Sequence, residues 1–380
     1  MSDTITGILK LVGNRQMVIR SADSSYRSGP GEVKVGPDMV GRFGLIEGAI
    51  VTGQTEQKKG KARLVSIESV GGMRPEDFRK RPRLADLVAI DPHERFNLGA
   101  SSQESMRIVD LIAPIGKGTR QLIVSPPKAG KTILLEQIVT AIHQCCPESR
   151  IIVLLIDERP EEVTHFRRAV EGAEVVASAS DNSANEHAEL AELMLAHVQT
   201  ELECGNEVVL LIDSLTRLGR AFNNRTRGRG TPRRHTMSGG LEAGILEVPR
   251  RLFGLARNVE NGGSVTIIAT CLINTGSRMD QLIFEEFKGT GNSEIVLDRS
   301  LAEGRIFPAI DIPASGTRKE VRLYSQDHSN GLATLRRVLS NYGTRDAMEA
   351  LFKLLKKYPT NEEFLESMCA CQGPIVPSDI

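Results

Sequence analysis

An apolar run of membrane-spanning length is missing from this sequence. No uninterrupted apolar stretch approaches the ~20 residues that a helix needs to cross a bilayer, and the first ten residues lack a secretory pattern. Cysteine is also scarce, and the six cysteines show neither paired CxxC spacing nor an adjacent set of histidines. These absences argue against a membrane partner, a zinc site and a disulfide framework. We therefore expect a cytoplasmic protein with reduced thiols.

Net charge is absent as well, since 48 Lys and Arg residues balance 48 Asp and Glu residues. Taken alone, this balance argues against a nucleic-acid partner. The charge is nevertheless uneven, because residues 1–83 contain fifteen Lys and Arg against nine Asp and Glu, a local balance of 15 − 9 = +6. A local basic patch matters more for phosphate binding than the total charge does.

Residues 7–70 contain short segments with apolar strand character, separated by glycine-rich turns. These segments lie at residues 8–11, 17–19, 33–35, 50–51 and 64–67. About five short strands with such turns predict a small all-β barrel of the OB or cold-shock type.

A different pattern begins after residue 104, where apolar runs alternate with longer helical stretches. Strands are expected at residues 122–125, 151–156, 175–177, 208–212 and 265–271, and helices at 133–143, 161–170, 184–202, 241–259, 332–339 and 346–358. Nearly continuous apolar strands between helices predict an α/β domain whose parallel sheet is covered on both faces. The expected organisation is a barrel at 1–71, a basic linker at 72–103, the α/β domain at 104–368 and a flexible tail at 369–380.

The strongest local motif is Ser-Pro-Pro-Lys-Ala-Gly-Lys-Thr at residues 125–132. It lies between an expected strand and an expected helix, where backbone N–H groups and a helix N-terminus can surround phosphates. In such a P-loop, Lys131 would contact the outer phosphates of ATP and Thr132 would bind Mg²⁺. The generic motif has glycine at the first position, which is occupied here by Ser125.

Two of the expected strands end in carboxylates. Asp213 follows the run 208–212 and is suited to the Mg²⁺ shell beside a P-loop. Glu158 follows the run 151–156 and is suited to orient and deprotonate the attacking water, with Arg159 sensing the γ-phosphate. A helix cap is the alternative role for each carboxylate, and Asp157 can fill it in the second case.

Arginines form two further features. Arg299, Arg305 and Arg318 are candidates for neutralising the transition state, often from a neighbouring subunit, and the residues alone do not choose among them. The stretch 225–235 holds five arginines and no acid. Binding of nucleic-acid phosphate is the favoured interpretation of this stretch, and a solvated loop is the alternative.

Together, these motifs resemble the Rho family of transcription termination factors. The matching segments stand in the family's order: RSADSSY at 20–26, PPKAGKT at 126–132, IDERPEEVT at 156–164, FKGTGN at 287–292, FPAID at 307–311 and SGTR at 315–318. The resemblance runs from about residue 7 to residue 364. It implies a RecA-like P-loop ATPase domain in a bacterial homohexameric ring, with ATP sites between subunits. It also implies RNA-dependent ATP hydrolysis, helicase activity and a role at the RNA polymerase elongation complex.

The resemblance also implies roles for individual residues. ATP contacts are implied for Gly116, Lys117, Gly118, Thr119, Arg120, Gln121, Lys128, Ala129, Gly130, Lys131, Thr132, Ile133 and Arg159, with Phe307 stacking on adenine. Glu158 would be the catalytic base, Asp213 and Thr132 would bind Mg²⁺, and Arg318 would act in trans. RNA contacts in the pore are implied for Arg233, Arg234, His235 and Arg278.

The barrel departs from the family pattern. Rho barrels stack RNA bases on aromatic side chains, but the corresponding positions here include Gln16, Val18, Lys34 and Lys61. Stacking contributes ~1–3 kcal/mol per base, so this loss is large. Phosphate contacts by Arg20, Lys34 and Lys61 would offset part of it without selecting bases.

Two alternatives therefore stay open. One is a Rho-derived nucleic-acid-binding ring protein with altered or lost RNA specificity, and the other is a different P-loop ring ATPase that acts on DNA. The presence of Lys131, Glu158 and Asp213 argues against a protein that has lost ATP turnover.

Overall fold

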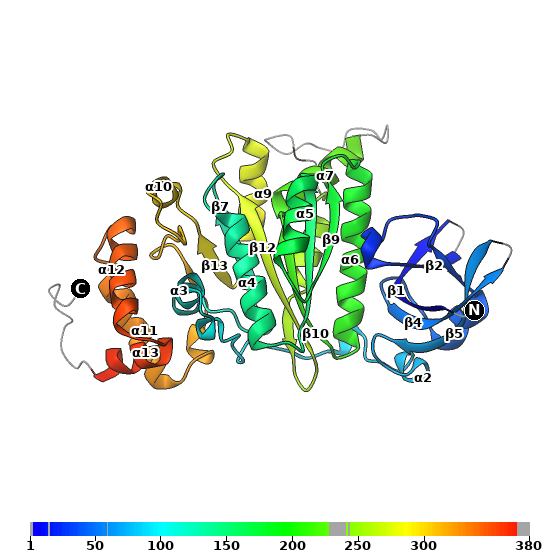
Figure 1. Cartoon of the computed structure of the whole chain (residues 1–380), viewed down its shortest axis with the longest axis horizontal. Helices are drawn as coiled ribbons and strands as arrows, with labels where there is room; N and C mark the ends of the chain where they lie inside the picture. The colour runs from blue at the N-terminus through cyan, green and yellow to red at the C-terminus, as the bar shows by residue number, and fades with distance from the viewer. Residues whose placement is uncertain (1–2, 14–15, 59, 228–240, 242–243, 371–380) are drawn as a thin grey trace.

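The N-terminal part of the chain forms a closed five-stranded barrel (Figure 1). The computed structural model describes residues 3–13, 16–58, 60–227, 241 and 244–370. The barrel strands are β1 (Asp3–Val12), β2 (Gln16–Arg20), β3 (Val33–Val35), β4 (Ile50–Lys58) and β5 (Lys61–Val70), in the order β1-β2-β3-β5-β4. A short helix, α1 (Pro37–Phe43), lies between β3 and β4. Side chains alternate between the two faces of a strand, so Leu9, Ile19 and Val51 are among those that fill the barrel core.

The rest of the chain is built around a nine-stranded, mostly parallel sheet. Its main path runs β14-β13-β7-β12-β10-β8-β9. Off this path, β11 pairs with β12, and β6 pairs with β11. The strands are β6 (Ala89–Ile90), β7 (Arg120–Ser125), β8 (Arg150–Glu158), β9 (Ala173–Ala179), β10 (Glu207–Asp213), β11 (Arg257–Val259), β12 (Ser264–Leu272), β13 (Ser293–Val296) and β14 (Gly316–Thr317). The helices are α2 (Pro75–Phe78), α3 (Glu104–Ile112), α4 (Lys131–Cys145), α5 (Pro160–Ala169), α6 (Ala184–Glu203), α7 (Leu215–Arg227), α8 (Glu247–Gly254), α9 (Arg278–Lys288), α10 (Arg299–Glu303), α11 (Gln326–Leu339), α12 (Thr344–Lys357) and α13 (Asn361–Ala370).

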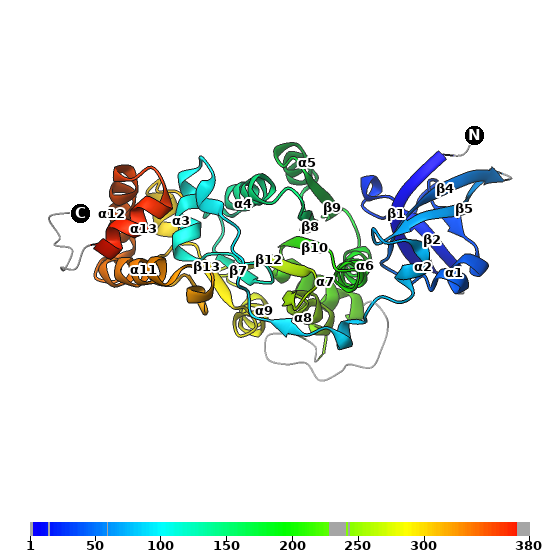
Figure 2. The same ribbon diagram turned by 90° about the horizontal axis from the view of Figure 1, so that it is seen from below.

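Helices cover both faces of this sheet, as the uninterrupted apolar strands predict. Along β8, Ile151, Val153 and Leu155 belong to one buried cluster, whereas Ile152 and Leu154 belong to another. The first cluster includes side chains of α4 and α5, and the second includes side chains of α6 to α9. Figure 2 shows α4 and α5 on one side of the sheet and α7, α8 and α9 on the other. The fold class is therefore confirmed.

The barrel is fixed to α6 and β9 by buried polar contacts. Tyr26 donates a hydrogen bond to the Glu174 carboxylate, and the Ala177 amide donates to Ser25 Oγ at 3.0 Å. Gly48 lies against α6, where its carbonyl oxygen is 2.7 Å from Nδ1 of His197. A side chain at Gly48 would come within 2.4 Å of the helix backbone, and its φ of 88° favours glycine as well.

Several elements differ from the expectations. Helix α7 was not predicted, because the polar run after Asp213 hides the helical spacing of Leu215, Leu218 and Phe222. The expected helix at 241–259 is only α8, and β11 follows it. The expected linker contributes β6 to the sheet, and α13 runs to Ala370.

No helix in the described ranges combines the length and apolar character that a membrane crossing needs. The domain boundaries stay a prediction.

Candidate nucleotide-binding and catalytic site

The candidate P-loop joins the end of β7 to the start of α4. Lys128 and Gly130 both have a positive φ, of 65° and 84°, which turns the backbone tightly around the helix N-terminus. The first N–H groups of a helix have no partner within the helix, so they are available to phosphate oxygens. Lys131 is the first residue of α4, and Thr132 follows it half-buried.

Carboxylates from neighbouring strands meet beside this loop. The Lys131 ammonium forms an ion pair with Asp213, at the end of β10, and lies 3.7 Å from Glu158, at the end of β8. Thr270 Oγ1 donates a hydrogen bond of 2.7 Å to the same oxygen of Asp213. The carboxyl ends of parallel strands thus bring together three residues that the sequence placed in one site.

Glu158 has an unusual environment for a carboxylate. It is 3% exposed, and two cations lie near its Oε1, with Arg217 Nη2 at 3.2 Å and Lys131 Nζ at 3.7 Å. Burial, followed by the negative charge of Asp213, raises the pKa of Glu158 to about 8, while Lys131 and Arg217 oppose the shift. A buried carboxylate with a pKa near neutral pH, beside a phosphate loop, is suited to general-base catalysis.

Sequence reasoning missed two polar residues of this site. Arg217 Nη2 lies 3.2 Å from Glu158 Oε1, and its Nη1 donates a hydrogen bond to the carbonyl oxygen of Asp157. Thr270 lies on β12 and holds Asp213. Arg217 stands four residues after Asp213, so recognising α7 would have placed it beside the strand ends.

An apolar cavity of about 440 Å³ opens next to the P-loop. Its lining includes Ala129, Gly130, Ile133, Leu134, Leu297, Phe307 and Pro308. Phe307 is 46% exposed, and a side chain at Gly130 would come within 3.2 Å of its ring. An exposed aromatic ring in an apolar cavity beside a phosphate loop can bind a planar base.

The segment from Gly116 to Gln121 does not join this cluster within one chain. It lies at the amino end of β7, whereas the P-loop follows the carboxyl end of the same strand. Its polar groups also have partners: Lys117 Nζ lies 3.0 Å from the Glu207 carboxylate, and the Gly118 amide donates to Thr266 Oγ1 at 2.8 Å. ATP contacts by this segment therefore stay a prediction and would have to reach a neighbouring subunit's nucleotide.

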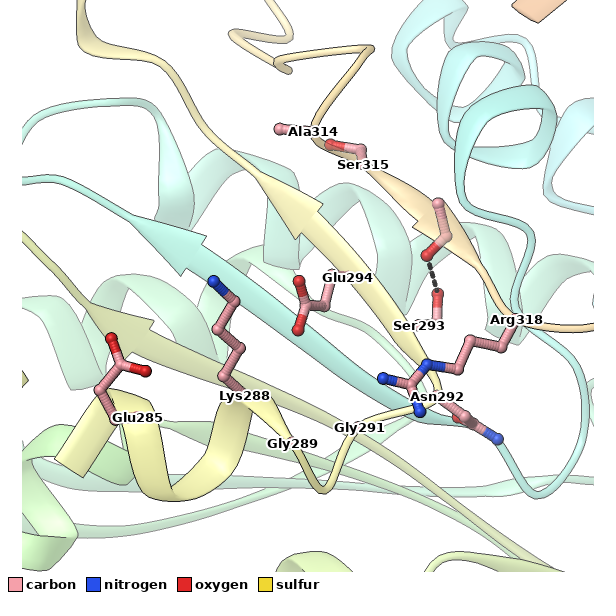
Figure 3. Close-up of a pocket in the computed structure, with 11 residues that line it drawn as sticks. Glu285, Lys288, Gly289, Gly291, Asn292, Ser293, Glu294, Ala314, Ser315 and Arg318 are labelled. Carbon is pink, nitrogen blue, oxygen red and sulfur yellow. Dashed lines mark hydrogen bonds between the residues drawn. The ribbon is translucent and has the colours of Figure 1, made fainter. Parts of the chain in front are cut away.

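Arg318 also lies on the side of the sheet where β7 begins, away from the P-loop. It follows β14, is exposed, and lines a cavity of about 710 Å³ together with Lys288, Asn292 and Glu294 (Figure 3). Of the two other arginine candidates, Arg299 pairs with Glu303 on the surface of α10, and Arg305 is exposed just after that helix. The Arg159 side chain is exposed next to Glu158.

The predicted RNA contacts are spread over the chain. Arg20 forms an ion pair of 2.7 Å with Glu32, whereas Lys34 is exposed in a cavity of about 290 Å³ on the barrel. Gln16 and Arg63 line that cavity too. Arg278 is exposed at the start of α9. The side chain of Lys61 and residues Arg233, Arg234 and His235 lie outside the described part of the chain.

The comparisons with known proteins agree with this geometry. Residues 105–317 match the ATP synthase alpha/beta family, nucleotide-binding domain. The chain is also similar to two solved ATPases of type III secretion systems. A prototypical ATPase of pathogenic bacteria gives a TM-score of 0.63 at 24% identity, over 88% of this chain and 98% of that one. EscN of enteropathogenic E. coli gives a TM-score of 0.61 at 21% identity, over 97% of each chain. At these identities, the likeness concerns the fold.

The curated relatives are much closer in sequence. Transcription termination factor Rho of Pseudomonas aeruginosa is 45% identical over 95% of this chain and 87% of its own length, and Rho of Haemophilus influenzae gives the same figures. Together with the P-loop and carboxylates, these matches identify an ATP-hydrolysing enzyme. The chain therefore belongs to the transcription termination factor Rho family.

Proposed function

We propose that this protein is an RNA-dependent ATPase that moves along RNA as a homohexameric ring and terminates transcription at the RNA polymerase elongation complex. The observation that carries the proposal is that the candidate catalytic residues lie at two opposite edges of one sheet. Lys131, Glu158 and Asp213 meet at one edge, and Arg318 lies exposed at the other. A second copy of the chain is needed to bring both halves together, as in a ring. A protein with this function would act in the cytoplasm.

The residues of the site support distinct roles in hydrolysis. Lys131 would leave its pair with Asp213 to bind the outer phosphates, and Thr132 and Asp213 would hold Mg²⁺. Their hydroxyl and carboxylate oxygens are the hard ligands that Mg²⁺ prefers, and the ion would neutralise phosphate charge. Glu158 would accept the proton of the attacking water, with Arg159 at the γ-phosphate and Phe307 on adenine.

RNA is the proposed track because the helix next to the catalytic edge leads into a basic stretch. Helix α7 starts two residues after Asp213 and leads into the five-arginine stretch 225–235. Arg220 pairs with Asp280 and Arg225 with Glu192, whereas Arg278, at the start of α9, is exposed. Cations that lack an acidic partner would bind the phosphate backbone.

The test of this function is ATP turnover by the full-length protein with a panel of RNA and DNA homopolymers. We expect turnover to rise with RNA and to stay near its basal level with DNA. Equal stimulation by DNA would favour a DNA-directed ring, and lack of turnover with every polymer would favour a binding protein that has lost hydrolysis.

The barrel should bind RNA mainly through phosphate contacts. Lys34 and Arg63 are both exposed in the barrel cavity, and its lining, completed by Gln16, Val35, Gly36, Pro37 and Ala62, has no aromatic ring. Binding of this kind weakens steeply with salt and ignores base identity. We therefore expect the full-length protein to bind poly(C) and poly(U) similarly.

A salt series on a double variant measures this contribution. Lys34→Ala with Arg63→Ala should reduce the slope of log K against log [salt] by about 1.4, because each phosphate contact on a single strand contributes about 0.7. Arg345→Ala, on the exposed surface of α12, is the matched control and should leave the slope unchanged. Cytosine-selective binding that persists at high salt would contradict the expectation.

A further inference from the structure

The side chain of Arg318 extends from a very short strand. Strand β14 has two residues, and it lies at the edge of the sheet, paired with β13 alone. The Arg318 amide donates a hydrogen bond of 2.8 Å to the Asn292 carbonyl oxygen. Because only two residues of β14 pair with β13, this pairing alone does little to fix the direction of the strand. Other contacts must therefore hold the backbone that carries Arg318.

Buried and half-buried side chains provide those contacts. Thr317 and Ser293 stand opposite each other in the register of β14 and β13, and their hydroxyl oxygens are 2.6 Å apart. Ser293 Oγ also lies 2.5 Å from the carboxamide of Gln121, on β7, and Thr317 Oγ1 lies 2.8 Å from the carbonyl oxygen of Pro114. Gln121 is fully buried and Ser293 is 2% exposed. Water is therefore excluded from the contact between Gln121 and Ser293, which strengthens it, whereas the contacts of Thr317 are half-buried.

The hydroxyl groups act as donors in this chain of contacts. Ser293 donates to Oε1 of Gln121 at 2.5 Å, and Thr317 donates to the Pro114 carbonyl oxygen at 2.8 Å. The amide nitrogen of Gln121 lies 3.4 Å from the Leu122 carbonyl oxygen, and Ser293 Oγ also lies 3.5 Å from the Gly316 carbonyl oxygen. Loss of the Thr317 hydroxyl would leave Ser293 and the Pro114 carbonyl oxygen without this partner.

A second connection runs parallel to the first. The Arg120 amide donates a hydrogen bond of 2.7 Å to the Asn292 side-chain oxygen, and the Asn292 carbonyl oxygen accepts from Arg318. Both connections start on β7, whose other end leads into the P-loop. The arginine offered to a neighbouring subunit is thus tied to the strand that carries this subunit's own phosphate loop.

We propose that Thr317, through Ser293 and Gln121, is a positioning residue that orients Arg318 toward the nucleotide of the adjacent subunit. The proposal rests on the proposed function of Arg318 in trans. Thr317 itself does not touch the substrate; its hydroxyl fixes the β14 backbone so that the guanidinium is held in the geometry that the transition state requires. The effect is therefore on turnover and not on nucleotide affinity, which depends on the P-loop.

Thr317→Val tests the proposal because it removes the hydroxyl and keeps the shape. RNA-stimulated kcat should fall about 10- to 100-fold, the loss expected when a catalytic group is displaced by about 1 Å, with the Kd for ATP unchanged. Thr317→Ser restores the hydroxyl and should recover most of the turnover. Thr334→Val is the matched control, since the Thr334 hydroxyl is exposed and bonds only to the Asn330 carbonyl oxygen within α11. Sedimentation verifies that each variant assembles.

Mixed assemblies separate positioning in trans from general damage. A Thr317→Val subunit keeps its P-loop, and a Lys131→Ala subunit keeps its Arg318 edge, so the two together form some intact sites. We expect the mixture to exceed both parents in turnover. If a mixture of Arg318→Ala with Lys131→Ala recovers activity but this mixture does not, the positioning role is wrong. If neither mixture recovers, the proposed trans role of Arg318 fails first. Unchanged kcat in assembled Thr317→Val also overturns the inference.

Discussion

Glu158→Ala should bind ATP as tightly as the parent protein and lose about 10²–10⁴-fold in RNA-stimulated kcat, the usual contribution of a general base. The base acts on the attacking water and not on ground-state ATP, so its removal affects the chemical step. Lys131→Ala should instead weaken ATP binding, because its ammonium is the cation placed at the outer phosphates. Equilibrium binding and single-turnover hydrolysis, measured on both variants, separate the two effects.

Glu158→Gln is the matched control for packing, because it keeps the shape of the buried side chain and cannot accept the proton. It should be as inactive as the alanine variant. Arg217, which lies 3.2 Å from Glu158, should keep the glutamine in place. A glutamine or alanine variant that retains most of the RNA-stimulated kcat would show that another group is the base.

The same assignment sets the pH dependence of the parent protein. Burial and the Asp213 charge raise the pKa of Glu158 to about 8 in the nucleotide-free chain, and a base works in its ionised form. The kcat/KM for ATP, which reports the free enzyme, should therefore fall about tenfold per pH unit below about pH 8. This limb of the profile should be missing from Glu158→Gln.

The raised pKa of Glu158 also has a consequence for stability. The folded state holds this proton more tightly than the unfolded state, so the stabilisation that it contributes is fully present below pH 4.5 and is lost progressively as the pH rises to about 8. Glutamine does not ionise, so Glu158→Gln should unfold at a higher temperature than the parent protein above that pH. Thermal unfolding of both proteins near pH 4.5 and above pH 8 checks the sign.

Much of the catalytic edge could be predicted because strand order does not affect it. Lys131, Glu158 and Asp213 each follow an apolar run, and the carboxyl ends of parallel strands meet at one edge of a sheet whichever strands are neighbours. Arg217 could not be predicted in the same way, since its position depends on a polar helix that was not recognised. Thr270 was hidden inside an apolar strand.

The residues at the amino end of β7, away from the P-loop, were harder to predict for a different reason. Gly116 and Lys131 are close in sequence, and the resemblance assigned both to ATP, yet one β-strand separates their segments. Contacts between Tyr26 and Glu174, or between Ser293 and Thr317, join parts of the chain that periodicity does not relate. Such tertiary pairings need the folded topology, whereas strand-end motifs need only the fold class.

Arg318→Ala should reduce RNA-stimulated turnover by about 10³–10⁵-fold, the contribution of an arginine that stabilises the charge on a transferring phosphoryl group. Arg318→Lys should recover little of this loss, because an ammonium does not reproduce the planar, bidentate guanidinium. Nucleotide binding should be almost unchanged in both variants, since Arg318 lies at the opposite edge of the sheet from the chain's own P-loop. Glu294, which faces Arg318 across the cavity, provides a control in Glu294→Gln with much smaller effects.

Mixing subunits determines whether Arg318 acts across an interface. In a ring assembled at random from equal amounts of Arg318→Ala and Lys131→Ala subunits, about a quarter of the interfaces join an intact P-loop to an intact arginine. Turnover should therefore rise well above that of either variant alone, and it should follow the mixing ratio with a maximum near equality. Activity that never exceeds the parents would place both residues in one subunit's site. Sedimentation that detects only monomers with ATP and RNA present would contradict the ring itself, because the exposed arginine of one chain would then have no neighbouring nucleotide to reach.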